Sequence, residues 1–206
     1  MIFLRVTSQN RRGSIRGIMK IGIMGAVGSF SEQAAEQYLR DFAPTTEATI
    51  AALVNAEAVL AAVETGAIEK GIFPIENSNG GIVLEAIHGM AGHRFKIERL
   101  FELDVHHMLL VRPGMTAGKI TVITSHDQAL KQCRMYLRRV WPEVRIEPYA
   151  DTAAAAKDLA AGTLPETTAV IAPRRCARLY ELEILEESIQ DLKFNYTTFV
   201  VATRAE

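Results

Sequence analysis

Short apolar runs alternate along this chain with longer stretches in which apolar residues recur at helical spacing. The short runs predict strands at residues 21–24, 71–75, 97–111, 119–124, 144–149, 168–172 and 199–202. The helical spacing predicts helices at residues 32–40, 49–64, 82–90, 125–140, 151–161 and 173–180. Because strands and helices alternate, the pattern predicts an α/β protein with mainly parallel sheets.

Polar residues cluster where the predicted strands give way to helices. The clusters are Gly28 with Ser29, Asn77 with Ser78, Ser125 with His126, and Arg174 with Arg175. In α/β sheets this edge binds ligands, because the helix N-termini there offer free N–H groups and the positive end of the helix dipole. We therefore expect the clusters to converge on a site for a small anionic ligand.

The composition is that of an ordinary globular protein. The 206 residues are 49% apolar and 23% charged, with a net charge of −1. This balance gives no reason to expect a nucleic-acid or membrane partner. No apolar run approaches the roughly 20 residues that span a bilayer.

The cysteines and histidines argue against a metal or cofactor. Cys133 and Cys176 are far apart and form no Cys-x-x-Cys motif, which fits a reducing, cytoplasmic location. No His-Glu-x-x-His spacing occurs, and the adjacent His106 and His107 would point to opposite faces of a strand.

The first twenty residues hold five basic side chains and no acid, a composition loosely like that of an organelle transit segment. Met19, followed directly by an apolar strand, nevertheless reads as a natural start. We therefore expect residues 1–18 to be a tail or an upstream extension outside the fold.

Four motifs carry a resemblance to a known family. They are residues 25–31 (GAVGSFS), 74–78 (PIENS), 125–133 (SHDQALKQC) and 189–199 (IQDLKFNYTTF). Together and in this order they resemble prephenate dehydratase, over nearly the whole chain from Lys20 to Thr203. The resemblance implies two α/β lobes with a cleft between them, like the type II periplasmic binding proteins. The predicted lobes are residues 19–98 plus 185–206, and residues 99–184.

The resemblance also implies an activity. Prephenate would lose carbon dioxide and its ring hydroxyl, giving phenylpyruvate on the way to phenylalanine. It further implies a homodimer or tetramer. A regulatory ACT domain commonly follows the catalytic domain in this family, and the sequence ends a few residues after its last predicted strand. We therefore expect that domain to be absent.

Four residues are expected to carry the chemistry. The resemblance makes Thr197 the catalytic threonine, and we expect it to act as a positioned donor in a dry cleft, because a free hydroxyl is a poor acid. Asn195 is expected to fix the turn that aims Thr197. Asn77 and Ser78 offer an amide and a hydroxyl after a buried strand, although an ordinary turn before the next helix would also explain them.

Five further residues are candidates for binding the two carboxylates of prephenate. Gly28 and Ser29 combine close backbone approach with a hydroxyl at a helix start. Ser125 and Gln128 stand at the start of a helix in the second lobe and suit the other carboxylate. His126 is expected to support the side chains that contact the substrate.

The motif at residues 197–199 departs from the family pattern of Thr-Arg-Phe. Thr198 stands where the arginine is expected, while Phe199 completes the motif, and both are assigned to substrate binding. Threonine cannot supply the planar donor fork of arginine. Arg174 and Arg175 are the best candidates for a replacement cation, and Lys193 is a weaker one.

Two alternatives to the dehydratase stay open, and the loss of that arginine favours the first of them. A decarboxylase of prephenate would expel carbon dioxide but keep the hydroxyl, giving a non-aromatic dihydro product. A binding module would hold prephenate or an aromatic acid without turnover.

Overall fold

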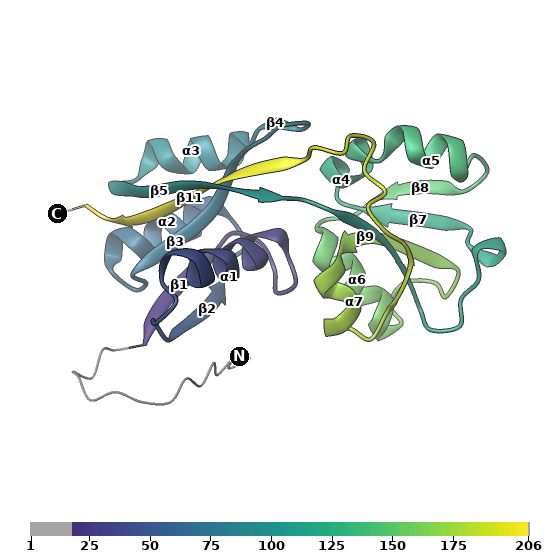
Figure 1. Cartoon of the computed structure of the whole chain (residues 1–206), viewed down its shortest axis with the longest axis horizontal. Coiled ribbons are helices and arrows are strands. Elements are labelled where there is room, and N and C mark those ends of the chain that lie inside the picture. Colours follow the sequence, from purple (N-terminus) through teal and green to yellow (C-terminus); the bar gives the residue numbers. More distant parts are fainter. Residues whose placement is uncertain (1–17, 206) are drawn as a thin grey trace.

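The chain folds into two α/β lobes that lie side by side and are joined by two crossings of the backbone (Figure 1). The structure is a computed structural model that describes residues 18–205. All of the predicted tail except Ile18 lies outside the described residues. The prediction of a two-lobed α/β fold is confirmed.

The first lobe is built on a sheet with strand order β2-β1-β3-β11-β5, and a short β4 pairs with β3. One helix, α1, covers one face of this sheet, and α2 and α3 cover the other. The strands are β1 (Met19–Ile23), β2 (Ala48–Ala52), β3 (Lys70–Asn77), β4 (Gly81–Ile82), β5 (Phe95–Asp104) and β11 (Tyr196–Arg204). The helices are α1 (Phe30–Phe42), α2 (Ala56–Thr65) and α3 (Leu84–Gly92).

The second lobe has a sheet with strand order β10-β6-β9-β7-β8. Helices α6 and α7 pack on one face and α4 and α5 on the other. The strands are β6 (His107–Val111), β7 (Val122–Ser125), β8 (Arg145–Pro148), β9 (Thr168–Pro173) and β10 (Glu183–Glu186). The helices are α4 (Asp127–Gln132), α5 (Arg134–Val140), α6 (Thr152–Ala161) and α7 (Arg174–Leu179), with a 3-10 turn at Ala117–Lys119.

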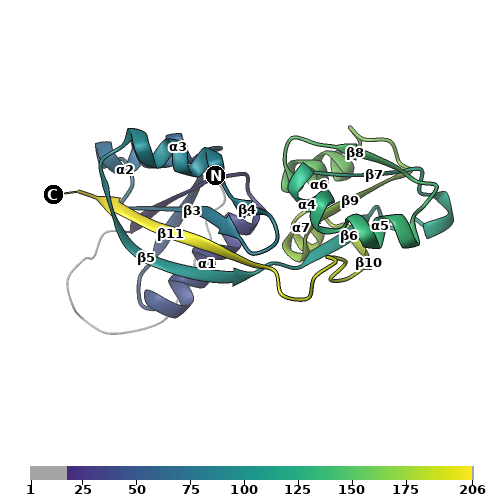
Figure 2. The same cartoon turned by 90° about the horizontal axis from the view of Figure 1, so that it is seen from above.

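Both sheets are mixed, so the prediction of mainly parallel sheets is wrong. β11 enters the first sheet between β3 and β5 and is antiparallel to both. β6 is likewise antiparallel to its neighbours β9 and β10. The reason is the double crossing, which Figure 2 shows from above: β5 leads out of the first lobe, and β11 returns beside it in the opposite direction.

The crossings also move the predicted lobe boundaries. The apolar stretch 97–111 is two strands in different sheets, so the first crossing falls at residues 105–106. β10 belongs to the second sheet and Ile189 to the second-lobe core, so the chain returns after residue 189. β10 was missed from the sequence because glutamates stand at both of its ends.

Two predicted helices are divided in the structure. Residues 48–52 form an edge strand on β1, and α2 begins only after Asn55, whose side chain accepts from the Ala58 N–H at 2.8 Å. The predicted helix 125–140 breaks at Cys133. There the Asp191 carboxylate accepts from the first N–H groups of α5, at Met135 and Tyr136, both at 2.8 Å.

A histidine links the two helices on the outer face of the first lobe. His93, at the end of α3, places Nδ1 2.7 Å from a carboxylate oxygen of Glu64 and Nε2 2.7 Å from one of Glu57. Both glutamates belong to α2. The hydrogen bonds to Glu64 and then to Glu57 raise the pKa of His93, because the imidazolium can donate from both ring nitrogens at once.

Candidate active site

Asn77, the last residue of β3, stands at the centre of a polar cluster between the lobes. Its Oδ1 accepts from the backbone N–H groups of Asn79 at 2.9 Å and Gly80 at 2.7 Å. Because a backbone N–H can only donate, these contacts fix which end of the Asn77 amide is oxygen. The Nδ2 group therefore donates to the Thr197 hydroxyl at 2.8 Å and to Asn195 Oδ1 at 2.9 Å.

The direction of these bonds determines what Thr197 can do. Its hydroxyl oxygen accepts from Asn77, so its own hydrogen points elsewhere. Within residues 18–205 that hydrogen has no acceptor. Thr197 lies on β11 directly opposite Asn77 and is 8% exposed. The cluster thus presents a nearly buried hydroxyl that is oriented to donate.

Asn195 is fully buried just before β11, where the returning chain meets the outgoing one. Its Nδ2 donates to the Val105 carbonyl at 3.1 Å, which fixes the amide so that Oδ1 faces Asn77. The Val105 N–H donates back to the Asn195 carbonyl at 2.8 Å. Asn195 therefore joins the two crossings and contacts Asn77.

Two side chains from the second lobe complete the cluster. Gln132, at the end of α4, donates to Asn77 Oδ1 at 3.2 Å and accepts from Asn195 Nδ2 at 2.8 Å. His107, the first residue of β6, places Nε2 2.8 Å from Gln132 Oε1. Neither residue was predicted to belong to the site, although Gln132 lies in one of the four motifs. His107 stands next to His106 in the sequence, and no residue pattern distinguishes the two rings.

Ser78, Gln128 and His126 lie at the rim of the cluster. The Ser78 hydroxyl accepts from the Tyr196 N–H at 3.0 Å, so its hydrogen is free to donate to a ligand. Gln128 donates to the Gly80 carbonyl at 3.2 Å, a contact between the lobes. His126 is exposed and caps α4, with Nδ1 accepting from the Gln128 N–H at 3.3 Å. These positions remain compatible with the predicted binding roles.

Gly28 and Ser29 lie at a second contact between the lobes. The Gly28 N–H, expected to bind a substrate carboxylate, donates instead to the Glu32 carboxylate at 2.6 Å. Ser29 caps α1 through the Glu32 N–H at 3.4 Å. Gly28 has φ +93°, and a Cβ there would lie 3.1 Å from the sulfur of Cys176 on α7, so glycine permits the close approach of the lobes. In this structure Glu32 therefore occupies the predicted anion position.

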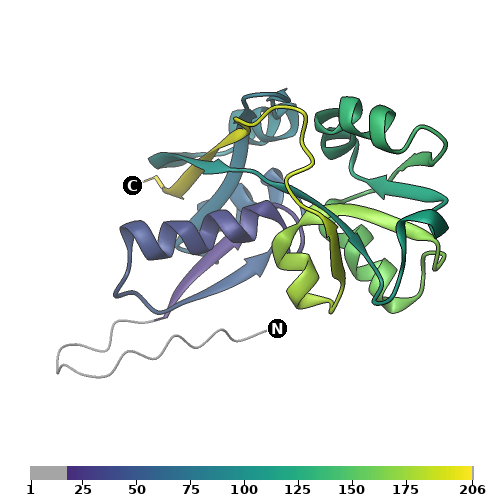
Figure 3. The same cartoon turned by 45° about the vertical axis from the view of Figure 1, so that its right-hand side comes forward.

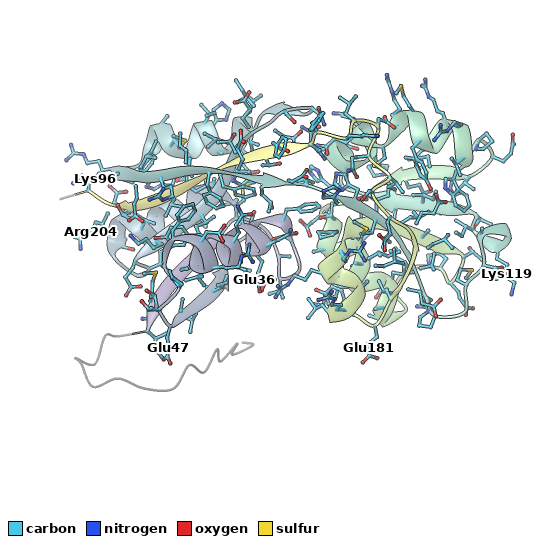
Figure 4. All side chains as sticks on the ribbon, in the orientation of Figure 1. Glu36, Glu47, Lys96, Lys119, Glu181 and Arg204 are labelled. Carbon is cyan, nitrogen blue, oxygen red and sulfur yellow. The ribbon has the colours of Figure 1, made fainter. Side chains whose placement is uncertain are left out.

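Arg175 and Arg174, the candidate replacement cations, are both paired with glutamates. The Arg175 guanidinium lies 3.1 Å from Glu32 and also bonds Glu36, both on α1 of the other lobe. Figure 3 shows α7 beside α1, and Figure 4 labels Glu36. Arg174 is exposed and bonds Glu187. Neither cation belongs to the Asn77 cluster, so neither replaces the missing arginine there; Arg175 joins the lobes.

Ser125 and Phe199 lie in the core rather than at the surface of the site. Ser125 is fully buried, and its hydroxyl donates to the Ile171 carbonyl at 2.6 Å. Phe199 is 1% exposed and stacks on Phe101, with ring centroids 5.9 Å apart. Neither side chain is therefore accessible for its predicted binding role. The Ser125 hydroxyl bonds a neighbouring strand of the second sheet, and the Phe199 ring packs on a neighbouring strand of the first sheet.

Thr198 points away from the cluster. Successive strand residues face opposite sides of a sheet, so Thr198 lies on the other face from Thr197. Its direct partners are Glu76 on β3 and Glu102 on β5, both exposed. An arginine at this position would stand between two carboxylates and not beside the Thr197 hydroxyl. The departure from the family pattern thus leaves the cluster itself unchanged.

The Asn77 cluster carries no formal charge. Burial lowers the pKa of His107 to about 4, so the ring is neutral at neutral pH. Among residues 18–205, no three histidine, cysteine or acidic side chains gather as a metal site would need. In the same range, no helix is long and apolar enough to cross a membrane.

The fold and the cluster define a two-lobed α/β protein with an uncharged polar site, assembled from both lobes, that presents one hydroxyl donor. The chain belongs to the prephenate dehydratase family, whose model matches residues 21–206.

The chain is similar to several proteins of this family. It is 35% identical over 201 residues to arogenate dehydratase 5 of Arabidopsis thaliana, covering 98% of this chain and 46% of the relative. It is 33% identical to the bifunctional chorismate mutase/prephenate dehydratase of Pseudomonas aeruginosa, covering 91% of this chain and 49% of the relative. The chain thus spans about half the length of these curated relatives.

A solved structure supports the fold. The prephenate dehydratase of Arthrobacter aurescens, crystallised with L-Phe, superposes with a TM-score of 0.80 at 26% identity. The match covers 91% of this chain and 60% of that one.

Proposed function

We propose that this chain catalyses the decarboxylating dehydration of prephenate to phenylpyruvate, a step of phenylalanine biosynthesis. One observation carries the proposal: the Thr197 hydroxyl accepts from Asn77 and keeps its own hydrogen free. A donor held in this way can protonate an oxygen that is leaving the substrate. The family membership supplies the substrate class.

In the proposed reaction the bond from the ring to its carboxylate breaks and carbon dioxide leaves. The released electron pair completes the aromatic ring as the carbon–oxygen bond to the hydroxyl breaks on its far side. The oxygen takes the Thr197 hydrogen and departs as water, and solvent returns a proton to Thr197. Because formation of the aromatic ring drives the reaction, positioning and one proton donor suffice.

The substrate is held by hydrogen-bond donors in this proposal. The hydroxyl of Ser78, the amide of Gln128 and the imidazole of His126 lie at the rim of the cluster and can face a carboxylate. Hydroxyl and amide donors suit a dianion that must give up one carboxylate as carbon dioxide, because a strong ion pair would stabilise the substrate as much as the transition state.

Entry of the substrate requires the lobes to separate. Thr197 is 8% exposed, and the contacts of Gln132 with Asn77 and of Gln128 with Gly80 cross between the lobes. We propose that the lobes open about the two backbone crossings and close over the substrate, which excludes water from the reacting oxygen. Arg175 would then re-form its ion pairs with α1 in the closed state.

The direct test is product analysis. The purified protein is incubated with prephenate, the absorbance of phenylpyruvate is followed in base, and products are identified by mass spectrometry. Phenylpyruvate supports the dehydratase. A hydroxylated dihydro product would establish the decarboxylase instead, and tight binding without turnover would establish a binding module.

A parallel incubation with L-arogenate separates the two substrates named among the relatives. Arogenate carries an amino group where prephenate has a keto group, so the same chemistry gives phenylalanine directly. Exclusive formation of phenylalanine would assign the chain to arogenate and overturn the preference for prephenate proposed above.

A further inference from the structure

His107 is a buried titratable side chain that the proposed chemistry does not use. It opens β6 at the first crossing and is 3% exposed. Its ring packs edge-on against Phe30 of the other lobe, with centroids 5.4 Å apart and planes at 84°. Its polar partner is Gln132, at 2.8 Å from Nε2.

The position of the His107 hydrogen follows from its neighbours. Gln132 Oε1 accepts from Asn195 Nδ2, and the Asn195 amide is fixed in turn by the Val105 carbonyl. Since Gln132 thus presents an oxygen to the ring, Nε2 must carry the hydrogen. The other ring nitrogen, Nδ1, is then a bare acceptor. It is buried and has no partner within residues 18–205.

This arrangement is unfavourable for a side chain that serves only to fill space. A buried acceptor without a partner destabilises the fold, whereas an apolar side chain of similar size would leave no unpaired acceptor. Burial also keeps the ring neutral by lowering its pKa to about 4, since a second ring hydrogen would have no acceptor. The ring is thus held as a single-direction donor aimed at Gln132.

We propose that His107 is a positioning residue that, together with Asn195, holds the orientation of the Gln132 amide and so keeps its NH₂ group donating to Asn77, the residue that bonds Thr197. The proposal rests on the function proposed above. If the Gln132 amide turned over, its NH₂ group would face the Asn195 donor, and His107 could accept from it only by moving its hydrogen to Nδ1, which is buried and has no partner within residues 18–205. Removing His107 takes away one of the two groups that penalise this flip. A flipped amide would also present oxygen to Asn77 Oδ1 and disturb the donor to Thr197.

The kinetic test compares two substitutions. His107→Leu keeps a similar volume but removes the Nε2–H donor. His107→Gln restores a donor, because the glutamine amide reaches about as far as Nε2 of the histidine. We expect His107→Leu to lower kcat for prephenate at least about tenfold with KM within about threefold, and His107→Gln to recover most of the loss. A role limited to packing predicts equal kcat for both variants, and that result would overturn the proposal.

His106 provides a matched control on the same crossing. Its ring is partly exposed and contacts Asp104, Ser188 and Gln190, which lie outside the Asn77 cluster. His106→Leu is expected to retain kcat. If His107→Leu does not fold, His107→Met replaces it with the same expected loss.

A spectroscopic measurement keeps the proposal separate from the function on which it rests. In ¹⁵N-histidine-labelled wild-type protein at neutral pH, His107 should show a protonated Nε2 and an unprotonated Nδ1. In uniformly ¹⁵N-labelled protein, the Gln132 side-chain amide should shift in His107→Leu but not in His106→Leu. The opposite tautomer, or an unchanged Gln132 amide, would refute the inferred bond. Wild-type protein that shows the predicted tautomer but turns over no prephenate would instead refute the proposed function.

Discussion

Replacing Thr197 by valine tests whether its hydroxyl is the proton donor. Valine has nearly the shape of threonine, so the change removes the hydroxyl without opening a cavity. One hydrogen of the Asn77 Nδ2 group loses its acceptor, while the other still bonds Asn195. A buried unsatisfied N–H costs roughly 1–3 kcal/mol, so the free energy of unfolding should fall by about that amount.

The effect on turnover should be larger than this ground-state loss. General-acid assistance typically contributes about 10²–10⁴ in rate. At about 1.36 kcal/mol for each tenfold change, that range corresponds to roughly 2.7–5.5 kcal/mol of transition-state stabilisation. We therefore expect Thr197→Val and Thr197→Ala to lower kcat about a hundredfold or more, with a smaller change in KM.

Thr197→Ser is the matched control, because it keeps the hydroxyl and loses one methyl group, worth about 0.8 kcal/mol when buried. Its kcat should stay within about tenfold of the wild-type value. Steady-state kinetics on prephenate give the rates, and urea denaturation gives the stabilities. Near-normal turnover by the valine variant, with a folded protein, would refute the reasoning from the direction of the Asn77 bond.

Three further predictions concern charges outside the cluster. Thr198→Arg should add up to about 1 kcal/mol to the free energy of unfolding, because the arginine can pair with Glu76 and Glu102. The same substitution should leave kcat unchanged, and a large rise in kcat would show that this position belongs to the active site. Arg175→Gln should lower the free energy of unfolding by roughly 1–3 kcal/mol, measured by urea denaturation, because its two glutamate partners on α1 lose their cation. An unchanged denaturation midpoint would show that these ion pairs between the lobes do not stabilise the fold. The pKa of His93 is raised in the folded state, so its bonds to α2 stabilise the fold fully below its unfolded pKa, near 6.5, and progressively less as pH rises through the folded value. Wild-type protein should thus lose its stability advantage over His93→Gln with rising pH, and a constant difference from pH 5 to 9 would contradict this.

The sequence located most of the elements, because apolar spacing reports burial directly. It failed where another part of the chain decides the local structure. Residues 48–52 look helical in isolation and become a strand because β1 offers them an edge. The helix over 125–140 breaks because Asp191, more than fifty residues later, caps its second half. Neither partner can be inferred from local propensity.

The candidate site was predicted in part for the same reason. Thr197, Asn195 and Asn77 were identified by motif, and the structure brings them together across 118 to 120 residues of sequence. His107 could not be distinguished from its neighbour His106, because only the crossing decides which ring is buried. The competition of Glu32 for the Gly28 N–H was likewise hidden, since an acid in the first turn of a helix is an ordinary feature.

β11 is the last strand of the chain to be made, yet it lies in the interior of the first sheet, between β3 and β5. This position sets the order in which the protein can fold during synthesis. The second sheet uses only the continuous segment from His107 to Glu186, so that sheet can form as soon as this segment has left the ribosome. At that stage the first sheet still lacks β11, the strand between β3 and β5. Pairing β11 with β3 joins residues more than a hundred positions apart in the chain, and such long-range strand pairing is intrinsically slow. The nascent N-terminal half would therefore expose two unpaired strand edges until residues 196–204 have been made, and Thr197 enters the molecule with the very strand that closes them.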